Sequence, residues 1–190
     1  RIAEYHEVCF LIYIRQDSPV DREISTMLQK DYAARGVEFI LGARVTSITH
    51  NAVTYEKDGK TTALPCDYAL VSIGRRPRTA GIGCENIGLL LERGAIVTNE
   101  MGKTNVPGVW AAGDVNGKSM LAHTAYREAE VAVNHMLGVN DEMRYDVIPA
   151  VIYTDPEVAS VGHSKEGAEK LGMKVKEVKL PMSYAGRYLA

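Results

Sequence analysis

The chain has 190 residues, a formal net charge of −2 and a hydrophobic content of 46%, so it can bury a core of ordinary size. The near-neutral charge, without a basic run that contains interleaved aromatic residues, argues against a nucleic-acid partner. No apolar run is long enough to span a membrane and no secretory signal pattern opens the sequence, so no membrane partner is expected. Cys9, Cys66 and Cys84 are odd in number and far apart, which favours free thiols in the cytoplasm over a disulfide framework.

The first third of the sequence predicts strand, helix, strand and then a meander. Residues 8–14 are a continuous apolar run, typical of a buried parallel strand. A helix is expected to start at Ser18-Pro19 with Asp21 as its capping-box acid, and to stop at Gly36. Its expected buried face is Ile24, Met27, Leu28 and Tyr32. Residues 37–41 predict a core strand, and residues 44–49, 52–57 and 60–64 predict a meander with a tight turn at Asp58-Gly59.

Two further strands are expected before the middle of the chain. Residues 68–73 form a second continuous apolar run that closes at Gly74, and residues 94–98 predict a shorter strand. The order helix, strand, meander, strand is typical of the second half of a doubly wound nucleotide-binding domain. The fold class is therefore predicted to be α/β.

The most informative stretch joins a short apolar run, residues 109–112, to a helix across Gly113-Asp114. The apolar face of that helix is predicted to be Leu121, Ala125, Ala129, Val133 and Leu137. Small residues at 111–113 would let a ligand approach the backbone, and Asp114 offers an acceptor for the hydroxyls of a sugar or polyol. The amides at the helix start suit an anion or an electron-rich carbonyl. A buried strand followed by a plain turn and cap would explain each piece alone, but the combination favours a cofactor site.

This stretch resembles a known family. The sequence TNVPGVWAAGD at residues 104–114 resembles the second flavin-binding motif of the pyridine nucleotide–disulfide oxidoreductases. The sequence MLAHTA at residues 120–125 is similar to the segment that follows it in the dihydrolipoamide dehydrogenase branch. The resemblance implies that Gly113 and Asp114 belong to an FAD site in which the aspartate holds the ribityl chain. It also implies that one edge of the flavin, the pyrimidine edge, faces the backbone amides of Met120, Leu121, Ala122 and His123.

The same resemblance suggests a dinucleotide site. Gly74, within SIGRRP at residues 72–77, corresponds to a glycine that lies against the nicotinamide half, and Val45 corresponds to a hydrophobic contact on the adenine side. A strand-ending turn and an ordinary core valine are the simpler explanations. NAD is expected, but NADP stays open, because Arg15 falls where the family usually has an acid and an arginine would favour a 2′-phosphate.

The last part of the chain resembles the start of the family's dimerisation domain, beginning at residues 148–162. Residues 164–171 predict a short helix stopped by Gly172, and residues 173–180 alternate like a half-buried strand. The expected division is residues 1–75 for the second half of an NAD(P)-binding domain, 76–145 for the returning part of an FAD-binding domain, and 146–190 for an incomplete dimerisation domain. The resemblance implies a homodimeric parent.

Several features of the family's chemistry are missing from this sequence. There is no Cys-x4-Cys pair and no Gly-x-Gly-x-x-Gly, and the family's C-terminal His-x4-Glu pair is absent, so no catalytic residue is expected in this span. His6 and Cys9 have no second ligand pair, so no metal site is expected either. The chain is interpreted as a fragment whose parent passes electrons from a dihydrolipoyl dithiol, on a lipoyl-bearing protein or a small molecule, through FAD to NAD. The alternatives are a mercuric- or glutathione-reductase-like enzyme and a non-catalytic dinucleotide-binding or assembly fragment.

Overall fold

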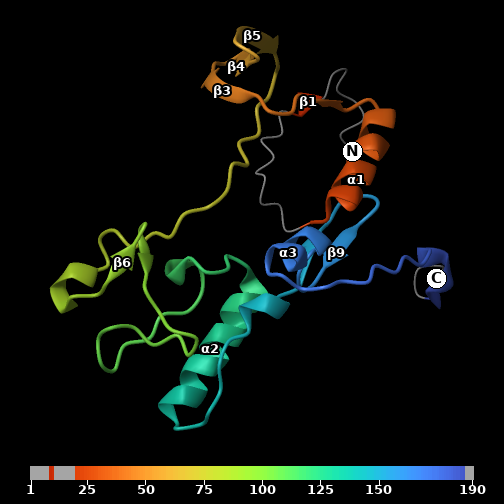
Figure 1. Ribbon diagram of the computed structural model, residues 1–190. Coiled ribbons are helices and arrows are strands. Elements are labelled where there is room, and N and C mark those ends of the chain that lie inside the picture. The colour runs from red at the N-terminus through yellow and green to blue at the C-terminus, as the bar shows by residue number, and fades with distance from the viewer. Residues whose placement is uncertain (1–8, 11–19, 187–190) are drawn as a thin grey trace. The chain divides into compact units, whose positions relative to one another are not determined.

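A computed structural model describes residues 9–10 and 20–186 of the chain, with a mixed α/β structure. The chain divides into two compact units. Unit one comprises residues 1–67 and 149–190, and unit two comprises residues 68–148. Figure 1 shows the order of their helices and strands along the chain.

Unit one contains the helix α1 (Arg22–Ala34), which ends before Gly36, where φ is +91° and a residue without a side chain is favoured. Its cap residue is Asp21, not the predicted Ser18, which lies outside the described residues. Asp21 makes no side-chain bond to its own helix; instead its Oδ1 accepts a hydrogen bond of 3.3 Å from the amide of Lys165. The predicted buried face of α1 is half-buried in the structure, except for Met27, which is 50% exposed.

The strands near the start of the chain follow the predicted order. β1 (Cys9–Phe10) pairs in parallel with β2 (Glu38–Phe39), while the rest of the predicted run at 11–14 lies outside the described residues. β3 (Arg44–Ile48), β4 (Ala52–Lys57) and β5 (Lys60–Pro65) form the predicted antiparallel meander, seen at one end of Figure 1. Asp58 and Gly59 both have positive φ, at 50° and 74°, as a tight two-residue hairpin turn requires.

The C-terminal part of unit one is a hairpin followed by a short helix. β8 (Ala150–Ile152) and β9 (Val158–Ser160) pair antiparallel, and α3 (Lys165–Lys170) follows. Ser164 caps α3 by accepting a 3.1 Å hydrogen bond from the amide of Gly167. The helix stops before Gly172 as predicted, and a single turn, η4 (Met182–Tyr184), comes near the end of the described residues.

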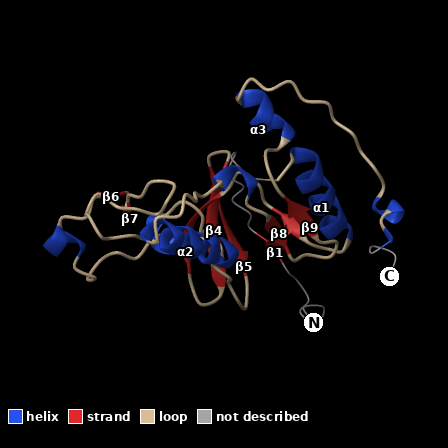
Figure 2. Ribbon diagram, turned by 90° about the horizontal axis from the view of Figure 1, so that it is seen from below, coloured by secondary structure: helices blue, strands red, loops and turns tan. Residues whose placement is uncertain are grey.

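α1 lies beside the β8–β9 hairpin (Figure 2). Arg35 Nη1 lies 2.9 Å from Asp155 Oδ2 in the hairpin turn, and the hydroxyl of Tyr32 accepts a 3.2 Å hydrogen bond from the amide of Asp155. These contacts connect the segment that precedes the meander to the segment that follows unit two in the sequence. Unit one is therefore assembled from two distant parts of the chain.

Unit two has a small apolar core made by Cys84, Ile96 and Ala111, with Leu89 and Val115 packed against it. Around this core lie η1 (Cys84–Ile87) and the hairpin of β6 (Leu91–Glu92) and β7 (Ala95–Ile96), which is shorter than the predicted strand at 94–98. The unit continues with η2 (Asp114–Asn116), α2 (Ala122–Met136) and η3 (Tyr145–Val147). The apolar run at 109–112 does not form a strand; it contributes one bridge, between Trp110 and Lys103.

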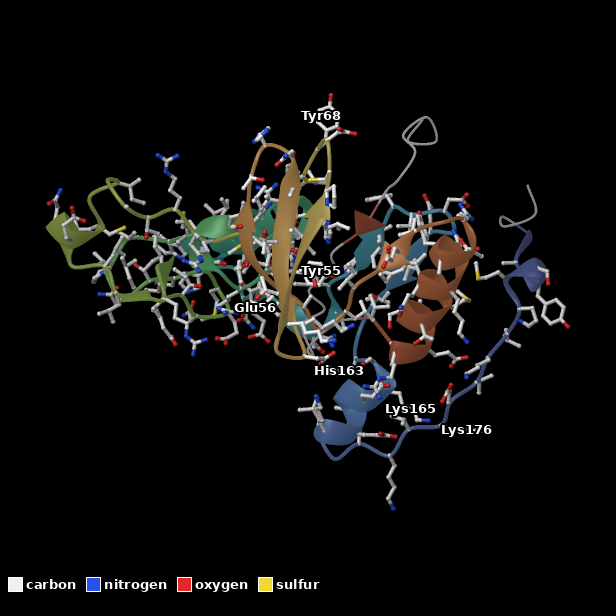
Figure 3. All side chains as sticks on the ribbon, turned by 90° about the horizontal axis from the view of Figure 1, so that it is seen from above. Tyr55, Glu56, Tyr68, His163, Lys165 and Lys176 are labelled. Atoms are coloured by element: carbon white, nitrogen blue, oxygen red, sulfur yellow. The ribbon has the colours of Figure 1, made fainter. Side chains whose placement is uncertain are left out.

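Two other predicted strands are wrong. Residues 68–73 and 173–180 have no strand structure, and Leu70 and Ile73 are 90% and 89% exposed. The side chain of Tyr68 projects away from the ribbon in Figure 3. A strand exists only where a neighbouring strand accepts and donates its backbone hydrogen bonds, and no strand among the described residues pairs with either segment.

The predicted apolar face of α2 is also wrong. The buried residues of this helix are Thr124, Glu128, Val131 and Ala132, whereas Val133 and Leu137 are 51% and 74% exposed. Ala132 packs near Gly102, where an added Cβ would lie 3.7 Å from the alanine methyl. The buried face is thus set by close packing and by the hydrogen bonds of Glu128, not by the largest apolar side chains.

In the described part of the chain, no helix is long and apolar enough to cross a membrane. The same residues contain no group of three or more His, Cys, Asp or Glu side chains arranged to hold a metal ion.

Candidate functional site

The predicted site forms a turn, residues 113–117, that leads from the core of unit two toward α2; we call it the Gly113–Asp114 turn. Gly113 has φ 83° and ψ −162°, and a Cβ built on it would lie 3.4 Å from the Cβ of Ala125 on α2. The positive φ favours glycine at this position, and the turn lies in van der Waals contact with the helix. Gly117 closes the turn with φ 70°, and a Cβ there would lie 2.7 Å from the Cβ of Ala95. The turn is held between α2 on one side and β7 on the other.

Glu128 joins this turn to the helix. The amide of Gly113 donates a 2.5 Å hydrogen bond to Glu128 Oε2, and the hydroxyl of Tyr145 donates a 2.8 Å hydrogen bond to Oε1. The glutamate is only 1% exposed, so both oxygens of a buried carboxylate are used inside the protein. Burial, followed by the hydrogen bond and the charge of Glu128, raises the pKa of Tyr145, which keeps its hydroxyl a donor.

The sequence analysis did not identify Glu128. The signal was its spacing, because positions 124, 128, 131 and 132 follow the i, i+4, i+7, i+8 pattern of one helix face. A glutamate on a helix is usually solvated, so hydropathy favours the more apolar face over this one.

Asp114 follows directly and is exposed. Its neighbour Asn116 is 5% exposed and accepts a 3.0 Å hydrogen bond from the amide of Lys118, which fixes the far side of the turn. The amide of Asn116 in turn donates to the carbonyl of Gly113 at 3.1 Å. The turn thus places one carboxylate at the surface while its own backbone is held from within.

The predicted helix-start residues lie at the beginning of α2 in the same unit. Leu121 is the cap residue, with extended backbone, and its side chain has no oxygen to accept from the first amides of the helix. Met120 is half-buried, whereas Leu121, Ala122 and His123 are exposed. Because Gly113 packs on Ala125, one turn into the helix, the structure brings these four residues and the turn that carries Asp114 to the N-terminal half of α2.

The two residues of the predicted dinucleotide site fall in different units. Gly74 has φ 107° with nothing within 4 Å of an added Cβ, so its backbone conformation alone explains the glycine. Val45 lies in β3 opposite Tyr55 and is 44% exposed, so it is not an ordinary core valine. The structure does not bring these two residues together within one unit.

Comparison with known families defines the class of protein. Residues 8–129 match the pyridine nucleotide-disulphide oxidoreductase family, and residues 148–190 match the dimerisation domain of that family. The chain therefore belongs to the pyridine nucleotide-disulphide oxidoreductases. Members of this family typically bind FAD and a pyridine nucleotide, and the dimerisation domain indicates that they form homodimers.

Among curated proteins, similar relatives are dihydrolipoyl dehydrogenases. Dihydrolipoyl dehydrogenase 3 of Pseudomonas aeruginosa is 39% identical over 188 residues, which cover 95% of this chain and 40% of the relative. The dihydrolipoyl dehydrogenase of Chlamydia muridarum is 40% identical over 169 residues, covering 88% of this chain and 36% of the relative. The chain thus spans about 40% or less of the length of these two relatives.

Solved structures give the same class. LpdA from Mycobacterium tuberculosis matches with a TM-score of 0.78 and 30% identity, covering 89% of this chain and 38% of that one. The HOCl-induced flavoprotein disulfide reductase RclA from Escherichia coli matches with a TM-score of 0.76 and 28% identity, covering 95% and 42%. The fold is therefore that of part of a flavoprotein disulfide reductase.

Proposed function

We propose that this chain supplies part of the FAD site of a dihydrolipoyl dehydrogenase. The observation that carries the proposal is the exposed Asp114 carboxylate, which stands on a turn bonded through Gly113 and Glu128 to α2. An isolated surface aspartate would need no buried carboxylate behind it. A turn that holds a ligand-binding group in one direction needs such buried support, since a small displacement of a binding group weakens binding.

The residues present fit a flavin dinucleotide. Asp114 can accept hydrogen bonds from the hydroxyls of the ribityl chain, because an ionised carboxylate has only acceptor sites to offer. The start of α2 carries the partial positive charge of a helix N-terminus, which suits the electron-rich pyrimidine edge at Met120, Leu121, Ala122 and His123. FAD, when bound, supplies two-electron transfer between a dithiol and a nicotinamide.

The remaining assignments extend this proposal to the whole enzyme. We assign residues 1–75 to the second half of a doubly wound NAD(P)-binding domain, with Val45 and Gly74 near the dinucleotide. Residues 76–145 are assigned to the returning part of the FAD-binding domain, and residues 146–190 to the start of the dimerisation domain. The substrate is a dihydrolipoyl dithiol and the acceptor is NAD, with NADP as the alternative. Arg15, on which that alternative rests, lies outside the described residues. Free thiols at Cys66 and Cys84 fit a reducing compartment such as the cytoplasm.

Titration of the purified chain with FAD tests the binding part of the proposal. We expect flavin fluorescence to be quenched on binding, and Asp114→Ala to weaken binding about ten- to a hundredfold, as for loss of a hydrogen bond to a charged group. The matched control is Glu92→Ala, an exposed acid of the same unit that lies on β6. Equal affinities for wild type and Asp114→Ala would refute the role of this carboxylate.

Assay of the full gene product tests the reaction. We expect the rate of NAD reduction by dihydrolipoamide to exceed the rates of turnover measured with the substrates of glutathione reductase or mercuric reductase. A preparation that binds no flavin and reduces no nucleotide would favour the alternative of a non-catalytic dinucleotide-binding or assembly module.

A further inference from the structure

We infer that Glu128 is a positioning residue for the Gly113–Asp114 turn and that Tyr145 ties this turn to the segment leading into the dimerisation domain. The inference rests on the proposed function, because positioning matters here only if Asp114 binds a cofactor. It concerns Glu128, which bonds to the turn, and Tyr145, which bonds to Glu128.

Both backbone polar groups of Gly113 are hydrogen-bonded. Its amide donates to Glu128 Oε2 at 2.5 Å, and its carbonyl accepts from the amide of Asn116 at 3.1 Å. Asp114 is the next residue, so the direction in which its side chain leaves the turn follows from the orientation of Gly113. A glutamate fifteen residues later thereby sets the direction of the Asp114 carboxylate.

The choice of a glutamate at this position is costly for stability. A buried carboxylate loses its hydration, and a well-packed apolar residue often stabilises a helix interface at least as well. What an apolar residue lacks is an acceptor for the Gly113 amide and for the Tyr145 hydroxyl. The buried acid is therefore explained by the two groups it holds, and not by helix packing.

Tyr145 also contacts the lysine that directly follows the turn. Lys118 Nζ, just beyond the turn, lies 4.9 Å from the centre of the Tyr145 ring and also donates a 3.0 Å hydrogen bond to the carbonyl of Asn99. Tyr145 begins η3 (Tyr145–Val147), and the match to the dimerisation domain begins at residue 148. One side chain thus connects the proposed cofactor turn to the entrance of the dimerisation segment, so that displacement of this segment is transmitted to the turn.

Hydrogen–deuterium exchange of the purified chain tests the inference without any ligand. We expect Tyr145→Phe to accelerate exchange at residues 110–118 about fivefold, the equivalent of one ordinary hydrogen bond, and Glu128→Ala to do so by about tenfold or more. Exchange at residues 84–97, the other side of the core, should change little. The matched controls are Glu130→Gln and Tyr126→Phe, exposed residues on the same helix.

The outcomes separate the inference from the proposed function. Unchanged exchange at 110–118, or acceleration spread equally over residues 84–97, overturns the positioning role; if Glu128→Ala does not fold, Tyr145→Phe decides. In the FAD titration, Tyr145→Phe should weaken binding about fivefold while Tyr126→Phe leaves it unchanged. Equal FAD affinity in Tyr145→Phe and wild type overturns the inference. A full gene product that binds no FAD refutes the proposed function, and the exchange result still decides whether Glu128 positions the turn.

Discussion

The interiors of the two units are stabilised by different kinds of interaction. Every buried polar or charged side chain among the described residues belongs to unit two: Thr79, Thr104, Asn116, Thr124 and Glu128. The buried side chains of unit one, in the same described residues, are the apolar Ile40, Ala43, Val158 and Ala168. Specific hydrogen bonds thus fix the interior of the unit that carries the candidate site.

Unit one also carries ion pairs at its surface. Arg35 pairs with Asp31 and Asp155, each at 2.9 Å, and Glu177 pairs with Lys165 and Lys179 at the same distance. Exposed pairs of this kind contribute little each, because water screens them and long side chains lose freedom. The comparison teaches that the two interiors differ: unit one buries apolar side chains, whereas the unit with the candidate turn also buries polar side chains that hold its backbone.

The largest expected effect is in unit two, from Gly117→Ala. The new methyl would lie 2.7 Å from the Cβ of Ala95, at a residue whose φ is 70°. We expect a loss of about 2–4 kcal/mol of unfolding free energy, combining overpacking with left-handed backbone strain. Gly138→Ala is the control, because its φ is 77° but nothing lies within 4 Å, so it should lose only about 1–2 kcal/mol. Equal losses in urea unfolding of the two variants would refute close packing of the turn on β7.

Asn105→Ala should have the next largest effect. Its Oδ1 accepts a 2.9 Å hydrogen bond from the amide of Leu90, and its Nδ2 donates a 2.8 Å hydrogen bond to the carbonyl of Gly88. Loss of both bonds should cost about 1–2 kcal/mol and should be seen in urea unfolding. Asn140→Ala, at an exposed position of the same unit, is expected to change little. A variant as stable as wild type would mean that this side chain does not fasten the loop.

Tyr145 should make unit two sensitive to alkali. Its pKa is raised above the ordinary value of 10.0, mainly by burial and by Glu128. The neutral hydroxyl therefore contributes stability that is complete below pH 10 and is lost as the pH rises toward the higher folded-state pKa. Above pH 10, the midpoint temperature of thermal unfolding should fall more steeply with pH for wild type than for Tyr145→Phe. Parallel curves for the two proteins would contradict this assignment.

The smallest effect is expected in unit one, from Glu177→Gln. Hydrogen bonds from Lys165 and Lys179 lower the pKa of Glu177 to about 2, and Lys179 also pairs with Glu23 on α1. The contribution is present above the ordinary value of 4.5 and is lost as the pH falls through about 2. Because the ion pairs are exposed and screened by water, we expect only slightly faster exchange at residues 173–180 in the variant and in high salt. Glu157→Gln is the exposed control in the same unit. A large loss of stability would show that surface pairs hold unit one more firmly than the comparison implies.

The sequence by itself determined the features that depend on neighbouring residues. The stop of α1 at Gly36, the turn at Asp58-Gly59 and the stop of α3 before Gly172 were predicted correctly. Each is decided within a few residues by a positive φ that favours glycine or a turn residue. The motif around Gly113 and Asp114 is equally local, and it was enough to identify the family.

Tertiary structure alone decided which segments pair and which face of a helix is buried. Residues 68–73 and 173–180 look like strands in sequence, but a strand needs the hydrogen bonds of another strand, and none of the described ones supplies them. Glu128 looks like a solvated residue, yet it is buried because the Gly113 amide and the Tyr145 hydroxyl come from elsewhere in the chain to meet it. Hydropathy describes one residue at a time, whereas burial of a charge depends on partners that only the fold brings together.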